Sequence, residues 1–279
     1  MNLQKKLQNM GIEQIDKIDP EFVRLIAYNV TEALTNAFPA IYEQYNNILA
    51  QLINCNMYTA QITKPISKVN YIYENNSIYI DESIDLTTIN EQIIHECIHY
   101  LQDSRNKNGK LNKIGLCNFG QFSVFGLGIN EAIVQYISAK TVKNEVEIIE
   151  KYGVRLKTIS PNYYPFLTSL IEQIAYLMGE DILVIGILYK GNKLEDELLN
   201  TFEANTKRII NQFDIIVDIN NKLNTETNQE KIKIYQEEIT AMYIDTQNKI
   251  FSTFFEKTLP KLTTCQEVDY YMDKAVCYR

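Results

Sequence analysis

The sequence predicts an α+β fold that is predominantly helical. Apolar residues recur at helical spacing over much of the chain, whereas residues 68–81 alternate β-branched and aromatic residues around a short polar stretch. Hydrophobic residues make up 46% of the 279 residues and charged residues 22%, a composition with which a globular chain can bury a core. We therefore expect a β-hairpin or small sheet in the first part of the chain and a helical C-terminal half.

The elements of the first part can be placed from local signals. Asp19-Pro20-Glu21 is typical of a helix start, because Asp caps, Pro fits the first helical position and Glu suits the positive end of the helix dipole. A second helix is expected after Pro39, to about Cys55. Residues 68–81 should form the hairpin, with its turn at the polar residues in the middle.

The central part contains a predicted helix from the capping box Thr88–Glu91 to about Leu101. Residues 104–120 are polar and contain glycine, so we expect a loop there, and glycines 120, 126 and 128 suggest a mobile or closely packed segment. A helix should resume near Ile129, and the chain beyond Pro161 reads as almost entirely helical. We predict one region over residues 1–160 and a helical region over 161–279, which can also form one continuous domain.

Charge and composition exclude some classes of function. The net charge of −8 argues against nucleic-acid binding and gives no reason for attraction to anionic membranes. We see no signal peptide and no stretch apolar enough to span a bilayer. The five cysteines are scattered, which favours reduced thiols and a cytoplasmic location, without excluding non-classical export. The sequence indicates no oligomeric state.

The segment His-Glu-Cys-Ile-His, residues 95–99, carries the strongest chemical signal. On a helix, His95 and His99 lie on one face, one turn apart, and can bind the same metal ion. This spacing, with Glu96 next to the first histidine, is typical of zinc peptidases, in which the glutamate acts as general base. The chain has only two histidines and both are in this motif, which makes a coincidental pair of histidines improbable. We therefore predict one Zn²⁺ per chain.

A catalytic zinc takes three protein ligands and leaves a position for water. Since no third histidine exists, the third ligand must be Asp, Glu or Cys. The segment Gly-Leu-Gly-Ile-Asn-Glu-Ala-Ile, residues 126–133, together with the motif at 95–99, resembles the gluzincin metallopeptidases, the thermolysin-like clan. The resemblance covers these two short motifs. It implies a zincin-like catalytic unit, with Glu131 as third ligand and Asn130 at the position of that family's asparagine.

Some positions around the predicted site depart from the family pattern. Gln135 stands where these peptidases have an aspartate that supports a zinc-bound histidine, and its amide oxygen can accept the imidazole N–H. Asp103, four residues after His99, is interpreted as a supporting group or a helix-end residue. Cys97 faces the apolar side of the helix and is expected in the core. The acidic residues 145, 147 and 150 are expected on a solvated surface.

A peptidase also needs a donor for the oxyanion that forms at the attacked carbonyl. Because no histidine is left, and because many gluzincins use a tyrosine after the third ligand, Tyr163 and Tyr164 are the best candidates. In this class an extended substrate commonly lies along an edge strand, which residues 71–73 or 78–80 could supply; alternatively, the hairpin only packs on the motif helix.

The sequence thus predicts a zinc-dependent peptidase that acts on a peptide or protein substrate. Two alternatives stay open: a zinc-binding interaction or sensor protein without peptidase activity, and a metal-dependent hydrolase of another amide or ester.

Overall fold

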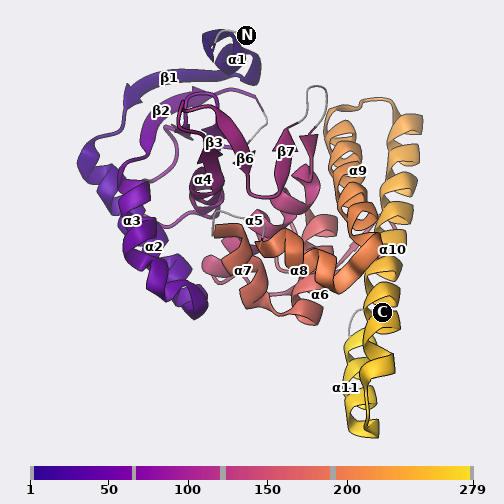
Figure 1. Ribbon diagram of the computed structural model, residues 1–279. Coiled ribbons are helices and arrows are strands. Elements are labelled where there is room, and N and C mark those ends of the chain that lie inside the picture. The colour runs from indigo at the N-terminus through magenta and orange to yellow at the C-terminus, as the bar shows by residue number, and fades with distance from the viewer. Residues whose placement is uncertain (1–2, 65–66, 120–123, 189–192, 277–279) are drawn as a thin grey trace. The chain divides into compact units, whose positions relative to one another are not determined.

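The computed structural model describes residues 3–64, 67–119, 124–188 and 193–276. The chain combines small sheets with many helices and is mostly helical (Figure 1), which confirms the predicted α+β class. It divides into two compact units, Met1–Gly115 with Ile137–Lys143 and Leu116–Tyr136 with Asn144–Arg279. The sequence-based boundary at residue 160 stays a prediction.

The first unit contains a four-stranded sheet with the strand order β1-β2-β4-β3. Its strands are β1 (Ile12–Lys17), β2 (Asn56–Ile62), β3 (Val69–Ile72) and β4 (Ser77–Asp81). Strands β2 and β4 are parallel, and the other two pairs are antiparallel. The β3–β4 pair confirms the predicted hairpin, and β3 forms an edge of this sheet.

The helices of the first unit are α1 (Leu3–Met10), α2 (Pro20–Ala37), η1 (Pro39–Gln44), α3 (Tyr45–Ile53) and α4 (Glu91–Gln102). Asp19 caps α2 as predicted, since its carboxylate accepts a hydrogen bond from the Glu21 N–H at 2.8 Å. The helix expected after Pro39 begins as a 3-10 turn and becomes α-helical only at Tyr45. Helix α4 packs against strands β3 and β4.

The loop expected over residues 104–120 is in large part a set of short strands. They are β5 (Asp103–Arg105), β6 (Leu111–Ile114) and β7 (Cys117–Phe119), and β8 (Val124–Phe125) follows. Strand β5 pairs with β6 in the first unit, and β7 pairs with β8 in the second. The prediction was wrong because backbone hydrogen bonds, rather than an apolar alternation of side chains, define these polar strands.

The second unit is helical beyond residue 161, as predicted. It contains α5 (Leu127–Thr141), of which the residues after Tyr136 belong to the first unit, and the antiparallel pair β9 (Glu147–Lys151) and β10 (Val154–Thr158). The remaining helices are α6 (Pro165–Met178), α7 (Glu180–Leu188), α8 (Lys193–Phe202), η2 (Glu203–Asn205), α9 (Thr206–Thr225), α10 (Gln229–Thr258), η3 (Leu259–Lys261) and α11 (Cys265–Val276). Helices α9 and α10 run side by side (Figure 1).

Each unit has an apolar core of its own. In the first unit a buried cluster joins α1 to the sheet, and its members are Leu7, Ile12, Ala60, Ile62, Ile72 and Tyr79. In the second unit α6 is buried along almost its whole length. Among the described residues, no helix combines the length and the apolar character that crossing a membrane requires.

Candidate metal centre

The helix that carries the His-Glu-Cys-Ile-His motif begins later than predicted. Helix α4 starts at Glu91, and its cap is Asn90, whose side-chain oxygen accepts hydrogen bonds from the backbone N–H groups of Gln92 at 2.8 Å and Ile93 at 3.4 Å. The hydroxyl of Thr88 instead donates to the Asp85 carbonyl. The predicted capping box at Thr88 is therefore wrong, although asparagine is among the best residues for this position.

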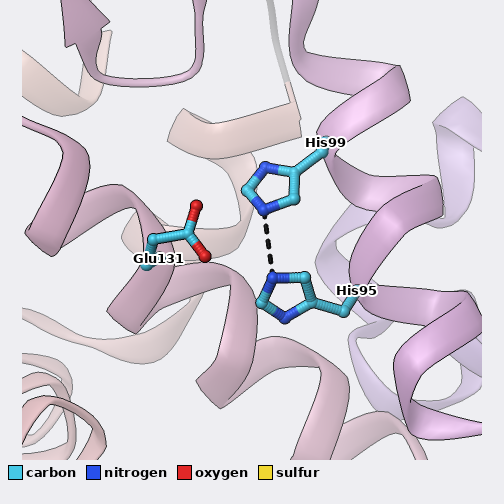
Figure 2. Close-up of side chains that lie close together, drawn as sticks. All are labelled: His95, His99 and Glu131. Atoms are coloured by element: carbon cyan, nitrogen blue, oxygen red, sulfur yellow. Dashed lines mark hydrogen bonds between the residues drawn. The ribbon is translucent and has the colours of Figure 1, made fainter. Parts of the chain in front are cut away.

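His95 and His99 face each other on α4, as the four-residue spacing predicts. Their Nε2 atoms lie 3.0 Å apart, and their rings are tilted by 70° (Figure 2). Both side chains are buried, with 9% and 8% of their surface exposed. Two nitrogens that bind one tetrahedral metal ion at ~2.0–2.1 Å lie roughly 3.3 Å apart. The histidine pair therefore needs little adjustment to bind one ion.

Glu131 on α5 completes this group. One ligand atom from each of His95, His99 and Glu131 lies within 4.8 Å of the other two. The Glu131 carboxylate points toward the two imidazoles (Figure 2). The histidines are buried and the glutamate is half-buried. These three residues could hold a metal ion.

Gln102 supports one of the two imidazoles, a role that the sequence did not suggest. Its side-chain oxygen lies 3.3 Å from His99 Nδ1. An Nδ1–H that donates to this oxygen leaves Nε2, the atom that faces His95 Nε2, unprotonated, which is the tautomer that a metal ligand needs. The spacing of three residues on a helix is the signal that could have identified Gln102.

Glu96 follows His95 on the same helix, and its side chain is half-buried. Its Oε2 atom accepts a hydrogen bond of 2.9 Å from the backbone N–H of Tyr71 in strand β3. The hairpin thus packs on the helix that carries the motif, which is one of the two roles considered for it from the sequence. It also contacts the predicted general base directly.

Asp103 is the C-cap residue of α4 and is buried. Its Oδ2 atom lies 2.6 Å from the Tyr71 hydroxyl and 2.7 Å from a guanidinium nitrogen of Arg105. The predicted helix-end position is confirmed, and these contacts connect the end of α4 to strands β3 and β5.

The start of α5, which carries Glu131, is fixed by a residue far along the chain. The Asp214 carboxylate of α9 accepts hydrogen bonds from the N–H groups of Gly126 at 2.8 Å and Gly128 at 2.7 Å. A Cβ at Gly128 would lie 2.2 Å from the carbonyl oxygen of Phe213, so only glycine permits this approach. The sequence predicted a mobile or closely packed segment around glycines 120, 126 and 128. Gly126 and Gly128 are closely packed, and Gly120 lies outside the described residues.

Asn130 and Gln135 are buried on the same helix and contact other parts of the second unit. Asn130, which is 0% exposed, accepts a hydrogen bond from the Leu116 N–H at 3.0 Å. The Gln135 amide nitrogen donates to the Ser160 hydroxyl at 2.9 Å. Gln135 therefore connects α5 to the segment that precedes α6, and its predicted support of a histidine stays a prediction.

That segment contains the two tyrosines proposed as oxyanion donors. The Ser160 hydroxyl donates to the backbone carbonyl of Tyr163 at 2.8 Å, and the Tyr163 side chain is 45% exposed. Tyr164 precedes α6 in a left-handed conformation with φ of 52°. The hydrogen bonds from Gln135 to Ser160 and from Ser160 to Tyr163 thus hold the backbone of this segment to α5. The role of either hydroxyl in stabilising an oxyanion stays a prediction.

Cys97 lies inside the motif and is 0% exposed. Burial raises the pKa of its thiol well above the usual range, and Cys55 and Glu96 act in the same direction. A thiol rather than a thiolate is a poor metal ligand. The position in the core that the helical phase predicts for Cys97 is confirmed.

No known protein family, curated protein or solved structure matches this chain. The chemistry of the site is therefore inferred from its own residues.

Proposed function

We propose that this protein is a zinc-dependent peptidase of the gluzincin type, in which His95, His99 and Glu131 bind the metal and Glu96 is the general base. The observation that carries the proposal is the convergence of the three ligand atoms within 4.8 Å, next to a glutamate that follows the first histidine. A zincin-like arrangement of the motif helix and the ligand helix is part of the same proposal.

Zinc is the metal that best fits this set of ligands. Two imidazole nitrogens and one carboxylate oxygen are a common set in catalytic zinc sites, which keep a fourth position for water. Magnesium and calcium prefer sites built entirely from oxygen, and thiolate-rich sites select other metals. We expect one Zn²⁺ per chain.

The reaction follows from the residues around this position. Zinc, when bound, lowers the pKa of a coordinated water to about 7 and polarises a substrate carbonyl. The Glu96 carboxylate takes the proton that the attacking water loses and delivers it to the leaving amine. The Tyr71 N–H donates a hydrogen bond to one oxygen of Glu96 and so holds this carboxylate next to the motif. We assign the oxyanion donor to Tyr163 or Tyr164 in this proposal.

A peptide or protein is the proposed substrate, and the test is cleavage of a broad peptide library followed by mass spectrometry. Wild-type protein loaded with zinc should cleave a subset of the peptides. Glu96→Gln should retain zinc and lose on the order of 10²–10⁴-fold in rate, because it removes the general base. Glu145→Gln is the matched control, since Glu145 is exposed and lies outside the metal group.

Two outcomes would contradict this proposal. A wild-type protein that binds zinc but cleaves no peptide would favour a zinc-binding interaction or sensor protein, or a hydrolase of another amide or ester. A Glu96→Gln variant that cleaves as fast as wild type would exclude Glu96 as the general base.

A further inference from the structure

A second set of residues in the first unit contacts the predicted general base through strand β3. The Glu96 carboxylate accepts a hydrogen bond from the backbone N–H of Tyr71, and β3 lies at the edge of its sheet, next to β4. In an antiparallel pair, successive residues direct their backbone groups alternately toward the partner strand and away from it. The N–H of Tyr71 is one that points away from β4, and Glu96 provides its acceptor.

The side chain of the same tyrosine is fixed at its other end. The Tyr71 hydroxyl lies 2.6 Å from Asp103 Oδ2 and 2.8 Å from Asn76 Oδ1. A hydroxyl has a single proton, and a carboxylate is the stronger acceptor, so the bond to Asp103 dominates. Burial and the neighbouring Asp103 raise the pKa of Tyr71 far above the usual range, so the hydroxyl remains a donor at every working pH.

Arg105 fixes the carboxylate that receives this hydrogen bond. A guanidinium nitrogen lies 2.7 Å from Asp103 Oδ2, and the same nitrogen bonds to the carbonyl of Tyr73, just after β3. Asp103 is buried, and Arg105 compensates its charge there. The carboxylate is thus held between the tyrosine and the arginine.

The geometry of α4 explains why one tyrosine can bind both acids. Glu96 and Asp103 are seven residues apart, which is close to two helical turns, so both lie on the same face of the helix, roughly 10 Å apart. Tyr71 bonds to the first through its backbone and to the second through its hydroxyl. Strand β3 cannot shift along α4 without breaking both bonds.

We propose that Tyr71, Asp103 and Arg105 form a positioning network that fixes the Glu96 carboxylate for proton transfer. The inference rests on the proposed function, since it assigns a purpose to residues around the general base of that reaction. A misplacement of about 1 Å in a catalytic group can cost on the order of 10²-fold in rate. The network limits such displacement by holding the strand that holds Glu96.

Tyr71→Phe tests the proposal, because it removes the hydroxyl and keeps the backbone N–H. The rate constant kcat should fall by about tenfold, whereas KM and the zinc content should stay close to the wild-type values. Asp103→Asn should reduce kcat in the same way. Tyr79→Phe is the matched control: Tyr79 lies on the neighbouring strand β4, is 1% exposed, and its hydroxyl bonds to Asn75 rather than to Asp103.

A double-mutant cycle separates positioning of Glu96 from a general structural effect. In the Glu96→Gln background, Tyr71→Phe should have no further effect on the residual rate, because the group that it positions has been removed. An equal fall of kcat in both backgrounds, or an equal fall in Tyr79→Phe, would overturn the proposal.

Hydrogen exchange of the Tyr71 amide tests the network without any catalysis. We expect the exchange of this amide to be at least tenfold faster in Tyr71→Phe and Asp103→Asn than in Tyr79→Phe. Unchanged exchange would contradict the network even in an active enzyme. If exchange is faster in these two variants but the wild-type protein cleaves no peptide, the network is retained, whereas the proposed function and the catalytic purpose of the network are rejected.

Discussion

The two helices that carry the candidate metal ligands are held at their first residues in different ways. Helix α4 is capped by its own neighbour in sequence, Asn90, which bonds to N–H groups two and three residues further on. Helix α5 begins with two backbone N–H groups bonded to Asp214, which is 86 to 88 residues away. One helix start is thus specified locally, and the other depends on the folding of the helical second unit.

This difference indicates which substitutions should displace the histidines and which should displace Glu131. The positions of His95 and His99 follow from a short segment and from the sheet on which α4 packs. The position of Glu131 depends on contacts between α5 and α9, which form only when distant parts of the chain meet. Substitutions at the start of α5 should therefore affect the protein more than substitutions at the start of α4.

The largest effect is expected from Gly128→Ala. Helix propensity alone would predict that alanine at a helical position stabilises the protein by about 1 kcal/mol relative to glycine. The added Cβ, however, would lie 2.2 Å from the Phe213 carbonyl oxygen, which is backbone and cannot rotate away. We expect a loss of about 3 kcal/mol in the free energy of unfolding, measured by urea denaturation. A gain in stability would contradict the close approach.

The pH dependence of the unfolding free energy should differ between Asp81, in the sheet against which α4 packs, and Asp214, in the second unit. Burial alone would raise the pKa of Asp81, but hydrogen bonds from Ser83 and the Ile62 N–H, with Lys68 nearby, lower it to about 2. The stabilising contribution of the ionised Asp81 carboxylate is therefore present above about pH 4 and is lost as the pH falls toward 2, which amounts to about 2 kcal/mol. Asp81→Asn should abolish this part of the pH dependence of the unfolding free energy.

The control for this effect is Asp214→Asn. Burial raises the pKa of Asp214, and the bonds from Gly128 and Gly126 only partly oppose the shift. Its contribution therefore decreases as the pH rises above about 3.8, the opposite sign to Asp81. Asp214→Asn should leave the slope between pH 2 and 4 in place. A slope that survives in Asp81→Asn would exclude the assigned role of Asp81.

Asp214→Ala should lower the stability by roughly 1–3 kcal/mol, because it removes both acceptors from the start of α5. It should also weaken zinc binding, since Glu131 lies on that helix. Asp218→Ala is the matched control on the same helix, where the carboxylate is exposed and pairs with Lys222. Equal unfolding free energies and zinc affinities in the two variants would show that the distant cap is dispensable.

The smallest effect is expected at the start of α4. Asn90→Ala should cost about 1 kcal/mol, the usual loss for an asparagine cap, while Thr88→Ala should change the stability by less than ~0.5 kcal/mol. Urea denaturation of the two variants decides between the two cap positions. A larger loss in Thr88→Ala than in Asn90→Ala would restore the capping box predicted from the sequence.

The same contrast explains how much of the structure the sequence could predict. The cap at Asp19, the hairpin at 68–81 and the pairing of His95 with His99 depend on residues close together in the chain, and these predictions are confirmed. Periodicity and capping rules describe interactions of this range. These rules predict that an element exists more reliably than they predict its first residue. For α4 they indicated a cap at Thr88, whereas the structure has it at Asn90.

Interactions between distant residues were beyond these rules. Neither the hydrogen bonds that Asp214 accepts at the start of α5 nor the contact of Tyr71 with Glu96 and Asp103 has a signal in the local sequence. Glu131 was nevertheless predicted, because metal chemistry requires a third ligand and a short motif indicated a candidate. In the structure it lies with His95 and His99 in the group that could hold a metal ion. Gln102 was missed although its spacing from His99 was informative, because the resemblance assigned the support of a zinc-bound histidine to Gln135.

The central claim, that His95, His99 and Glu131 form one zinc site, is tested most directly by zinc titration of the purified protein against a competing chelator. The wild type and Glu145→Gln should each bind one zinc ion with equal affinity. Loss of a residue that only supports a ligand costs ~10–100-fold in metal affinity. The zinc affinity of Glu131→Gln should fall by more than this, because the ligand itself is removed. A Glu131→Gln variant with wild-type affinity and stoichiometry would contradict the assignment.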